Sequence, residues 1–572
     1  MKTLDLRFRG EINTEVSELL NQIAENNINS FNQIISEISK ENLDNLNWWV
    51  KSPASRNTYS SPLFYRLTCL KLLDELIREN KFIYSKILVD SFEFSILIKK
   101  LLKKKENSKI KVYNTQDFSL ITKNIKNNFH KIKTSIFFIL KYFVVKILVS
   151  KENFLSPIKV VDTFLMPRFV KKDRWYASFF NELNFKQIQN LYFIPTIVNS
   201  TILDISKIIL KSKNTNRKII FKESYISFID VFYIIFNLFN NRFKIKSVKY
   251  LGLEISSIVK EEFRFVRDQS TIVESLIIYK MFNNFYKQNI KIVIAIDWFE
   301  GHSIDKSWSF SLNKFFPECK TYGFRGGGDF SLHLCNYPIQ VEKEANVIPE
   351  TFLVPGTGYQ KLVSKYLKNI KSIVVPSFRT LHVWDNYNSN LSKNDKKNNF
   401  IILVSLPINL EISKIILKLI VNLKMNSECL LDKPIFNVKT HPAFNTDLEF
   451  NKLCDSLPSN IIFKKNKNFN SLLRNSNLLI SEASGTCLES MALGVPVIVI
   501  KNPRGLFYNP IVFEVPDEMF KFASSIDELN NQILYFRNNQ KTLQKTHTKN
   551  SKIIRSNYFE PSKNKIINKI IK

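Results

Sequence analysis

The sequence predicts an α/β protein of the doubly wound class, with two Rossmann-like domains that face each other across a cleft. Three observations carry this prediction. The 572 residues exceed the roughly 150 residues of an ordinary domain. Short β-branched apolar runs alternate with helical patterns, which is typical of parallel sheets covered on both faces. The alternation stops at a polar segment, 386–399, and then starts again.

The first domain, expected over residues 1–385, contains four strand-then-helix patterns. The expected strands are 85–89, 158–161, 218–221 and 291–296, and the helical patterns after them are 92–105, 175–190, 226–239 and 303–316. Residues at the carboxyl ends of parallel strands line the ligand crevice, so polar residues at these ends are candidate site residues. As contacts for an acceptor or a phosphate we expect Asp90, Asp162 and Lys222.

The polar segment 386–399 is the expected linker, because it is rich in turn-forming residues and lacks periodicity. A second α/β domain is expected over 400–545. Its strands are expected at 400–404, 435–438, 460–463, 478–480 and 495–500. A basic helical tail, 546–572, follows this domain.

One segment of the first domain, around 117–151, departs from the alternation and is expected to be a long amphipathic helix. From Phe118 to Lys151 it holds seven lysines and no acidic residue, and its apolar residues recur at spacings of three and four. An apolar face opposite lysines is typical of a helix at an anionic membrane interface. A surface helix that packs its apolar face on its own domain has the same pattern. The sequence leaves both interpretations open.

The net charge of +32, from 83 Lys and Arg against 51 Asp and Glu, admits nucleic acid, an anionic membrane or acidic metabolites as partners. Part of the lysine excess is a solvated surface that needs no partner. No zinc-finger, helix-turn-helix or RNP string supports nucleic acid, so we expect no nucleic-acid partner.

We expect a cytoplasmic protein that associates peripherally with the inner membrane. The amino terminus has no apolar core of signal-peptide length. The longest apolar run, 134–150, is interrupted by Lys141 and Lys146 and is too short to span a bilayer, so no transmembrane helix is expected. Six cysteines without a C-x-x-C pair indicate reduced thiols.

The segment SEASGTCLESMALGVPV, 481–497, is the most informative motif. Its small and hydroxyl residues lie between an apolar strand and a helix, where a phosphate can approach backbone N–H groups. Ser484, Gly485 and Thr486 are therefore candidate phosphate contacts, and Glu489 can accept from ribose hydroxyls. Alternatively, Ser484 or Thr486 is only an N-cap with Glu489 as its capping-box partner.

This segment resembles the nucleotide-sugar-binding segment of GT-B glycosyltransferases and related sugar-nucleotide epimerases. The resemblance implies that Ser484, Gly485 and Thr486 contact the donor phosphates and that Glu489 holds the ribose. A second string, Lys439-Thr440-His441-Pro442, is similar to the His-Pro motif of bacterial sialyltransferases and Kdo transferases. There the His contacts the donor phosphate, which favours a CMP-activated sugar here, with UDP- or GDP-sugars as alternatives. Lys439 and His441 are thus further donor-binding candidates.

A general base for the acceptor hydroxyl is expected after the strand 291–296. Glu300 is the first candidate, followed by Asp297, His302 and Asp305. The Glu300-Gly301 pair resembles the acid-Gly motif that carries the base in several sialyltransferase families. Glu300 as a plain helix-capping carboxylate is the competing interpretation.

The loop 322–329 holds three consecutive glycines and presents Arg325 to a phosphate or carboxylate, unless it is only a flexible turn. No D-x-D string and no metal-ligand spacing of Cys and His occur. We therefore expect no metal and no cofactor other than the nucleotide-sugar co-substrate.

Further strings extend the resemblance along the chain: WWV (48–50), SPASRN (52–57), SPLFYRL (61–67), VVDTFL (160–165), FKESY (221–225) and WFEGHSIDKSW (298–308). Together they resemble a bacterial family of GT-B-like surface carbohydrate biosynthesis proteins, associated with lipopolysaccharide or capsule. The family implies an inverting, metal-independent glycosyltransferase that acts on a glycan or lipid-linked acceptor. A sugar-nucleotide epimerase, a non-catalytic GT-B scaffold and, last, a nucleic-acid-binding protein are the alternatives.

Overall fold

The computed structural model describes residues 2–571 apart from three longer gaps, at 385–399, 424–433 and 442–457. Shorter gaps lie at 108, 116–119, 153, 155, 168, 172, 178, 199, 241, 465–466, 503–504, 513, 563–565 and 567–569. The expected linker, 386–399, therefore lies outside the described residues.

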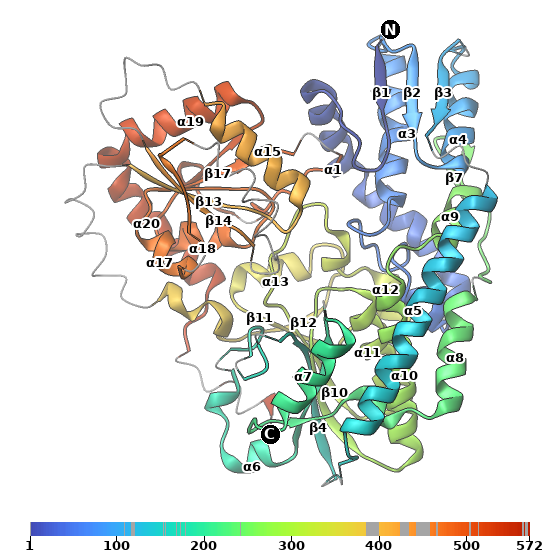
Figure 1. Cartoon of the computed structure of the whole chain (residues 1–572). Helices are drawn as coiled ribbons and strands as arrows, with labels where there is room; N and C mark the ends of the chain where they lie inside the picture. Colours follow the sequence, from blue (N-terminus) through green and yellow to red (C-terminus); the bar gives the residue numbers. More distant parts are fainter. Residues whose placement is uncertain are drawn as a thin grey trace.

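We call the described residues up to 384 the first half of the molecule and those from 400 the second half. Seven parallel strands form the sheet of the first half, in the order β12-β11-β10-β9-β4-β5-β6 (Figure 1). Their bounds are β4 Ile158–Leu165, β5 Leu191–Ile197, β6 Lys218–Ile219, β9 Ile292–Trp298, β10 Lys320–Phe324, β11 Thr351–Val354 and β12 Lys371–Val374. The strand order reverses between β4 and β9, so the carboxyl ends of these two strands flank a topological switch point. Helices α10 (Gln269–Lys287) and α11 (Ser303–Phe315) pack on each other and share a core with this sheet.

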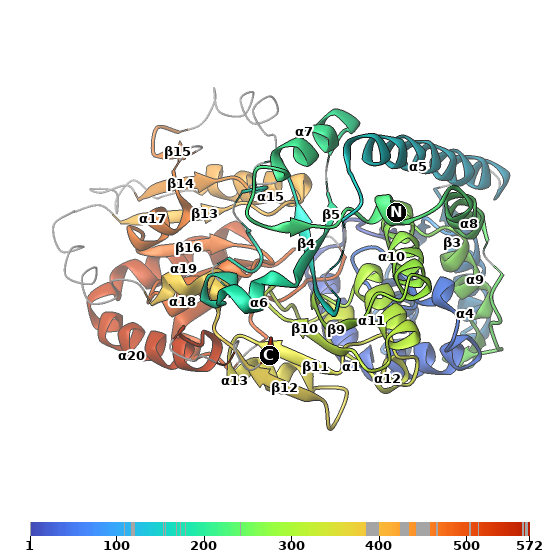
Figure 2. The same cartoon turned by 90° about the horizontal axis from the view of Figure 1, so that it is seen from below.

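Six parallel strands form the sheet of the second half, in the order β15-β14-β13-β16-β17-β18. Their bounds are β13 Ile401–Ser405, β14 Ile435–Lys439, β15 Ile461–Phe463, β16 Leu478–Ser481, β17 Val497–Ile500 and β18 Phe520–Ala523. The helices around them are α15 Leu410–Val421, α17 Phe469–Arg474, α18 Thr486–Ala492 and α19 Ile526–Asn538. The expected class is confirmed, because two Rossmann-like parallel sheets face each other, as in the GT-B architecture (Figures 1 and 2).

The first of the expected strands, 85–89, does not join the large sheet. It forms β2 (Lys86–Val89) in a separate three-stranded parallel sheet, between β1 (Thr3–Asp5) and β3 (Lys111–Asn114). Both edges of β2 are thus hydrogen-bonded within the amino-terminal region. Helices α1 Thr14–Ser39, α3 Leu63–Arg78 and α4 Phe92–Lys104 belong to this region.

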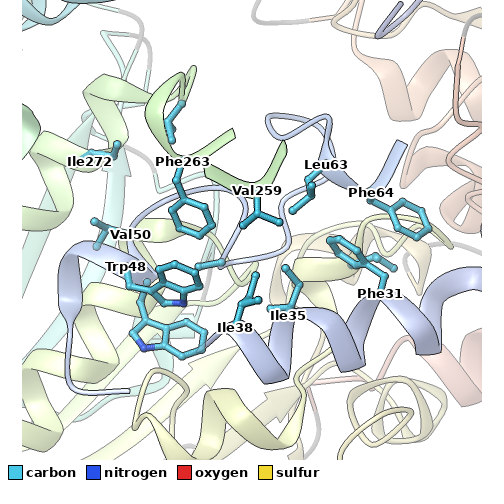
Figure 3. Packing of buried hydrophobic residues seen from close by; sticks show 14 of the residues in the cluster. Phe31, Ile35, Ile38, Trp48, Val50, Leu63, Phe64, Val259, Phe263 and Ile272 are labelled. Carbon is cyan, nitrogen blue, oxygen red and sulfur yellow. The ribbon is translucent and has the colours of Figure 1, made fainter. Parts of the chain in front are cut away.

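A large aromatic and aliphatic core joins the amino-terminal region to the first large sheet (Figure 3). Trp48, on the short helix α2 (Leu46–Trp49), stacks on Phe263 of α9 (Ser256–Arg264) with ring centroids 4.0 Å apart. Its Nε1 donates to Ser39 Oγ at 3.0 Å. Trp48 and Trp49 are fully buried, so the tryptophan pair of the sequence motif serves the fold.

The carboxyl-terminal segment crosses from the second half back to the first. Helix α20 (Gln540–Tyr558) begins before the expected tail, and the chain after it contacts the first large sheet. Glu560 N–H donates to Pro355 O at 2.7 Å, and Lys159 Nζ donates to Ile571 O at 2.6 Å. Ile570 and Ile571 are buried in the core beside β9 and β10. The tail is therefore packed against the first half over its described residues.

Helices α5 Leu120–Leu148 and α8 Phe228–Phe239 lie side by side on the outer side of the first half, away from the second sheet (Figures 1 and 2). Helix α7 Ile202–Ser212 also packs on α5. Among the described residues, no helix combines the length and the apolar content that crossing a bilayer requires. The remaining elements are α6 Phe185–Gln189, α12 Gln340–Glu344, α13 Thr357–Val363 and the antiparallel pair β7 Lys249–Tyr250 and β8 Leu253–Glu254.

Candidate functional site

A cavity of about 850 Å³ lies between the two large sheets. From the first half it is lined by Arg174, Arg379 and the glycines 326–328, and from the amino-terminal region by Arg9 and Tyr59. The second half contributes the loops that follow β13, β14 and β16. Because these loops leave the carboxyl ends of parallel strands, the cavity lies where open α/β sheets bind ligands.

The loop after β16 brings four of the expected donor contacts to this cavity: Ser484, Gly485, Thr486 and Glu489. Ser484 Oγ lies 2.8 Å from Thr486 Oγ1, so the two hydroxyls form one polar edge. The N-cap of α18 is Gly485, which has no side chain to cap the helix, and Glu489 Oε2 lies 3.3 Å from His382 Nε2. The capping-box interpretation of this loop is therefore wrong, although Ser484 Oγ does accept from Thr486 N–H at 3.3 Å.

Two glycines bring the halves of the molecule into contact beside this loop. A Cβ placed on Gly328 would lie 3.2 Å from the backbone N and Cα of Gly485. A side chain at Gly328 would push the two walls of the cavity apart, whereas a Cβ on Gly485 would lie 3.4 Å from Gly328 Cα, in ordinary contact. The triple glycine thus has a steric role, since it permits a close approach between two loops from different sheets.

Lys439 and His441, the expected contacts after β14, also line the cavity. Burial, together with the nearby Arg174 and Arg379 guanidinium groups, lowers the pKa of His441 to about 4. The imidazole is therefore neutral at pH 7. Burial likewise lowers the pKa of Lys439. Two arginines from the first half thus lie near a neutral imidazole. Lys439 lines the same cavity, with its Nζ donating to Lys464 O at 3.2 Å. Cations and an imidazole around one cavity suit an anion such as a phosphate or carboxylate.

The sequence interpretation missed Arg174, Arg379 and also Glu482. Glu482 lines the cavity and is 7% exposed. Burial raises its pKa to about 7, although the Ala483 N–H acts in the opposite direction. A carboxyl that titrates near neutral pH in a cavity is suited to proton transfer. Glu482 is part of the SEASGT string, so its place directly after a strand could have marked it as a site residue.

Glu300 lies in the turn between β9 and α11, behind the glycine loop. Its carboxylate accepts from Trp298 Nε1 at 2.9 Å and lies 3.2 Å from His302 Nε2. Burial raises the pKa of Glu300, but these bonds outweigh it and hold the pKa at about 2. A Cβ on Gly327 would lie 2.8 Å from Glu300 Oε1, so Glu300 adjoins the cavity wall and is kept ionised.

Asp305 fixes this turn, because its carboxylate accepts from the backbone N–H groups of Glu300 and His302, both at 2.9 Å. Asp297 and Asp162 are buried on the adjacent strands β9 and β4 and do not line the cavity. Burial raises the pKa of both carboxyls well above the ordinary value, and nearby carboxylates raise that of Asp297 further.

The other expected acceptor-side contacts are engaged inside the protein. Asp90 pairs with Arg66 at 2.9 Å and accepts from Phe8 N–H at 3.2 Å. Lys222 pairs with Glu274 at 2.9 Å and is fully buried. Arg325 donates to Asp329 and to Asn336 O. None of Asp90, Lys222 and Arg325 lines the cavity.

The structure also brings together a cluster that no sequence spacing indicates. His302, His333 and Cys335 hold three donor atoms within 4.8 Å of one another. Burial raises the pKa of the Cys335 thiol, but the two imidazoles outweigh it and lower the pKa to about 6. For His302, burial lowers the pKa, but the hydrogen bonds to Cys335 and Glu300 outweigh burial and raise the pKa well above its ordinary value. Nitrogen and sulfur donors of this kind suit a zinc ion or a thiolate–imidazolium pair.

No family model and no curated protein matches the sequence. Among solved structures, the UDP-GlcNAc 2-epimerase from Neisseria meningitidis bound to UDP-GlcNAc is similar with a TM-score of 0.37 and 14% identity, over 69% of this chain and 98% of the epimerase. MurG from Acinetobacter baumannii gives 0.37 and 10%, over 72% and 99%. The wall teichoic acid polymerase TagF gives 0.38 and 11%, over 79% and 98%. With TM-scores below 0.5, none of these likenesses assigns an activity to this chain.

Proposed function

We propose that the protein is a GT-B-type glycosyltransferase, inverting and metal-independent, that transfers a sugar from a nucleotide sugar to a surface polysaccharide or lipopolysaccharide precursor. One observation carries the proposal. The cavity is lined by the hydroxyl-rich loop, Lys439 and His441 from the second half and by Arg174 and Arg379 from the first, with Glu300 behind the glycine loop.

In the proposed reaction, the second half binds the donor. Lys439, Arg174 and Arg379 neutralise the departing nucleotide phosphate, while Ser484 and Thr486 donate hydrogen bonds to it. The neutral His441 imidazole contributes an N–H donor without adding a charge, and Glu489 holds the ribose. The His-Pro resemblance and the several cations favour a CMP-activated acidic sugar, with UDP- and GDP-sugars as the alternatives.

Two carboxylates divide the work at the acceptor. Glu300, ionised at every working pH, is a weak base but a strong hydrogen-bond acceptor, so it orients the acceptor hydroxyl. Glu482, with a pKa of about 7, is matched to removing the hydroxyl proton as the bond to the sugar forms. His302 positions Glu300 through their 3.2 Å contact.

Glu482 also suits one alternative, a sugar-nucleotide epimerase, because epimerisation needs an acid or base with a pKa near neutral beside the sugar. Product formation separates the two activities. An epimerase converts the sugar nucleotide with no acceptor present, whereas the proposed transferase requires one. A scaffold without activity would show neither.

The test is a thermal-shift series with CMP, UDP, GDP and their sugars, UDP-GlcNAc included, followed by a transfer assay with the stabilising donor. A ligand that binds the folded state raises the melting temperature by mass action. We expect stabilisation by one base class, lost in His441→Ala, with retention in Asp90→Asn as the matched control. Absence of any shift, together with unchanged surface glycans in cells carrying His441→Ala, would refute the transferase.

We further propose that the protein works in the cytoplasm, attached peripherally to the inner face of the inner membrane, where lipid-linked acceptors are found.

A further inference from the structure

Helix α5 differs from an ordinary surface helix, because it buries two of its lysines and exposes a row of apolar side chains. Its lysines Lys131 and Lys141 are each only 4% exposed. Lys141 Nζ pairs with Glu223 at 2.6 Å and with Glu274, which also binds Lys222. The apolar row of α5 faces outward instead, with the following residues 39–79% exposed: Ile121, Ile125, Phe129, Ile132, Ile136, Phe137, Leu140, Phe143 and Ile147. Packing of this row on its own domain, one of the two interpretations of the sequence, is thus excluded.

Helix α8 extends the same apolar surface. It lies beside α5 in both views (Figures 1 and 2). Its large exposed side chains are all apolar or aromatic, and they are Phe228, Ile229, Phe232, Tyr233, Phe236 and Phe239. On the other neighbour of α5, helix α7 adds Leu203 and Leu210. A contiguous apolar surface of this extent on a soluble domain marks an interaction site.

The charges around this surface select the partner. Helix α5 has exposed lysines at Lys126 and Lys133. Helix α7 has exposed lysines at Lys207 and Lys211. Arg242, Lys244 and Lys246 are exposed just beyond α8. The acid within α8, Asp230, is buried and accepts from Ser227 and Asn284. On the outward faces of α5 and α8, which we call the α5–α8 surface, the exposed charged side chains of the described residues are therefore Lys126 and Lys133 alone. The flanks carry the other cations together with two acids, the half-buried Asp204 of α7 and the exposed Glu152 after α5.

We propose that the α5–α8 surface seats the protein on an anionic lipid bilayer, with both helices lying in the interface. Apolar side chains of this kind enter the boundary between headgroups and acyl chains, while lysines and arginines at the rim meet anionic headgroups. At 1.5 Å per residue the 29 residues of α5 form a rod about 43 Å long, which provides an extended line of attachment. A second copy of the chain suits this surface less, because a two-fold contact would bring rim cations against one another.

This inference concerns the outer face of the first half and holds whichever donor the cavity binds. Vesicle binding tests it with the full-length chain. Wild type is mixed with vesicles of phosphatidylcholine alone or with three parts in ten of phosphatidylglycerol, and the bound fraction is measured by flotation. We expect binding to the anionic vesicles, at least tenfold weaker to the neutral ones.

Two outward-facing substitutions, Phe129→Asp and Phe232→Asp, should together reduce anionic-vesicle binding at least tenfold. Ile83→Asp, at a residue 58% exposed away from this surface, is the matched control and should bind like wild type. Donor-induced thermal stabilisation should be the same in all variants, which shows that they fold and separates this test from that of the activity. Wild-type binding by the double variant, or a dimer in gel filtration that the double variant converts to monomer, would overturn the proposal.

Discussion

Because the carboxyl of Glu482 is buried, we expect its replacement to change stability and activity in opposite directions. In the folded protein its pKa is about 7 against an ordinary 4.5. Between these two values the folded state keeps a proton that the unfolded state has lost, so this group's contribution to stability falls as the pH rises from about 4.5 to about 7. At 1.36 kcal/mol per unit, the cost above pH 7 is about 3 kcal/mol.

Replacing Glu482 with Gln removes this cost, because the amide does not ionise. The variant should resemble wild type in stability near pH 4.5 and exceed it by about 3 kcal/mol at pH 8. For a folding unit of the second half's size this corresponds to roughly 6–12 °C in melting temperature. The same variant should lose transfer activity by about 100-fold or more, because the base is gone. A gain in stability with a loss of activity is the expected signature of a functional residue.

Thermal unfolding of Glu482→Gln followed by circular dichroism at pH 5 and pH 8 measures the effect. Glu514→Gln, at a side chain 82% exposed, is the control and should show no pH-dependent difference from wild type. If the difference in melting temperature between Glu482→Gln and wild type were equal at both pH values, the raised pKa would be refuted. If turnover survived in Glu482→Gln, Glu482 would not be the base.

Three further predictions follow from other parts of the structure. Lys141→Met leaves the buried Glu223 carboxylate without its cation and removes one of the two cations of Glu274. It should lower the free energy of unfolding in urea by about 3–5 kcal/mol. Lys133→Met, on the exposed side, should change it by less than about 0.5 kcal/mol, and equal effects would contradict the inward orientation of Lys141. Gly328→Val should separate the two cavity walls and abolish donor-induced stabilisation, and a normal thermal shift in this variant would argue against a closed donor site. Chelators should leave turnover unchanged if the reaction is metal-independent; a stoichiometric zinc ion that is lost in Cys335→Ser, with activity lost alongside it, would contradict that proposal.

The sequence predicts the second sheet well, because five of its six strands, all but β18, follow the expected apolar runs and the SEASGT loop is at the expected strand end. In the first large sheet only β4, β6 and β9 were expected, and β5, β10, β11 and β12 were not. Pairing between strands is not local, and this is why 85–89 could not be assigned to its own small sheet. Its partners, 3–5 and 111–114, are too short to carry a recognisable pattern.

The site was harder to predict where its parts come from distant segments. Arg174 and Arg379 flank His441 although more than 60 residues of sequence separate each from it. His333 and Cys335 meet His302 only because the glycine loop folds over the turn after β9. The orientation of α5 depended on Glu223 and Glu274, whose carboxylates draw Lys141 inward. A helical period gives the width of an apolar stripe, but its direction depends on neighbours outside the helix.

The return of the carboxyl-terminal segment to the first half constrains motion between the halves. The chain leaves the first half after Trp384, is described again in the second half from Phe400, and returns to the first half after Tyr558. The two passages are held close together, because Trp384 Nε1 donates to Phe559 O at 2.9 Å. The carboxyl-terminal segment therefore ties the second half back to the first beside the point where the chain leaves the first half.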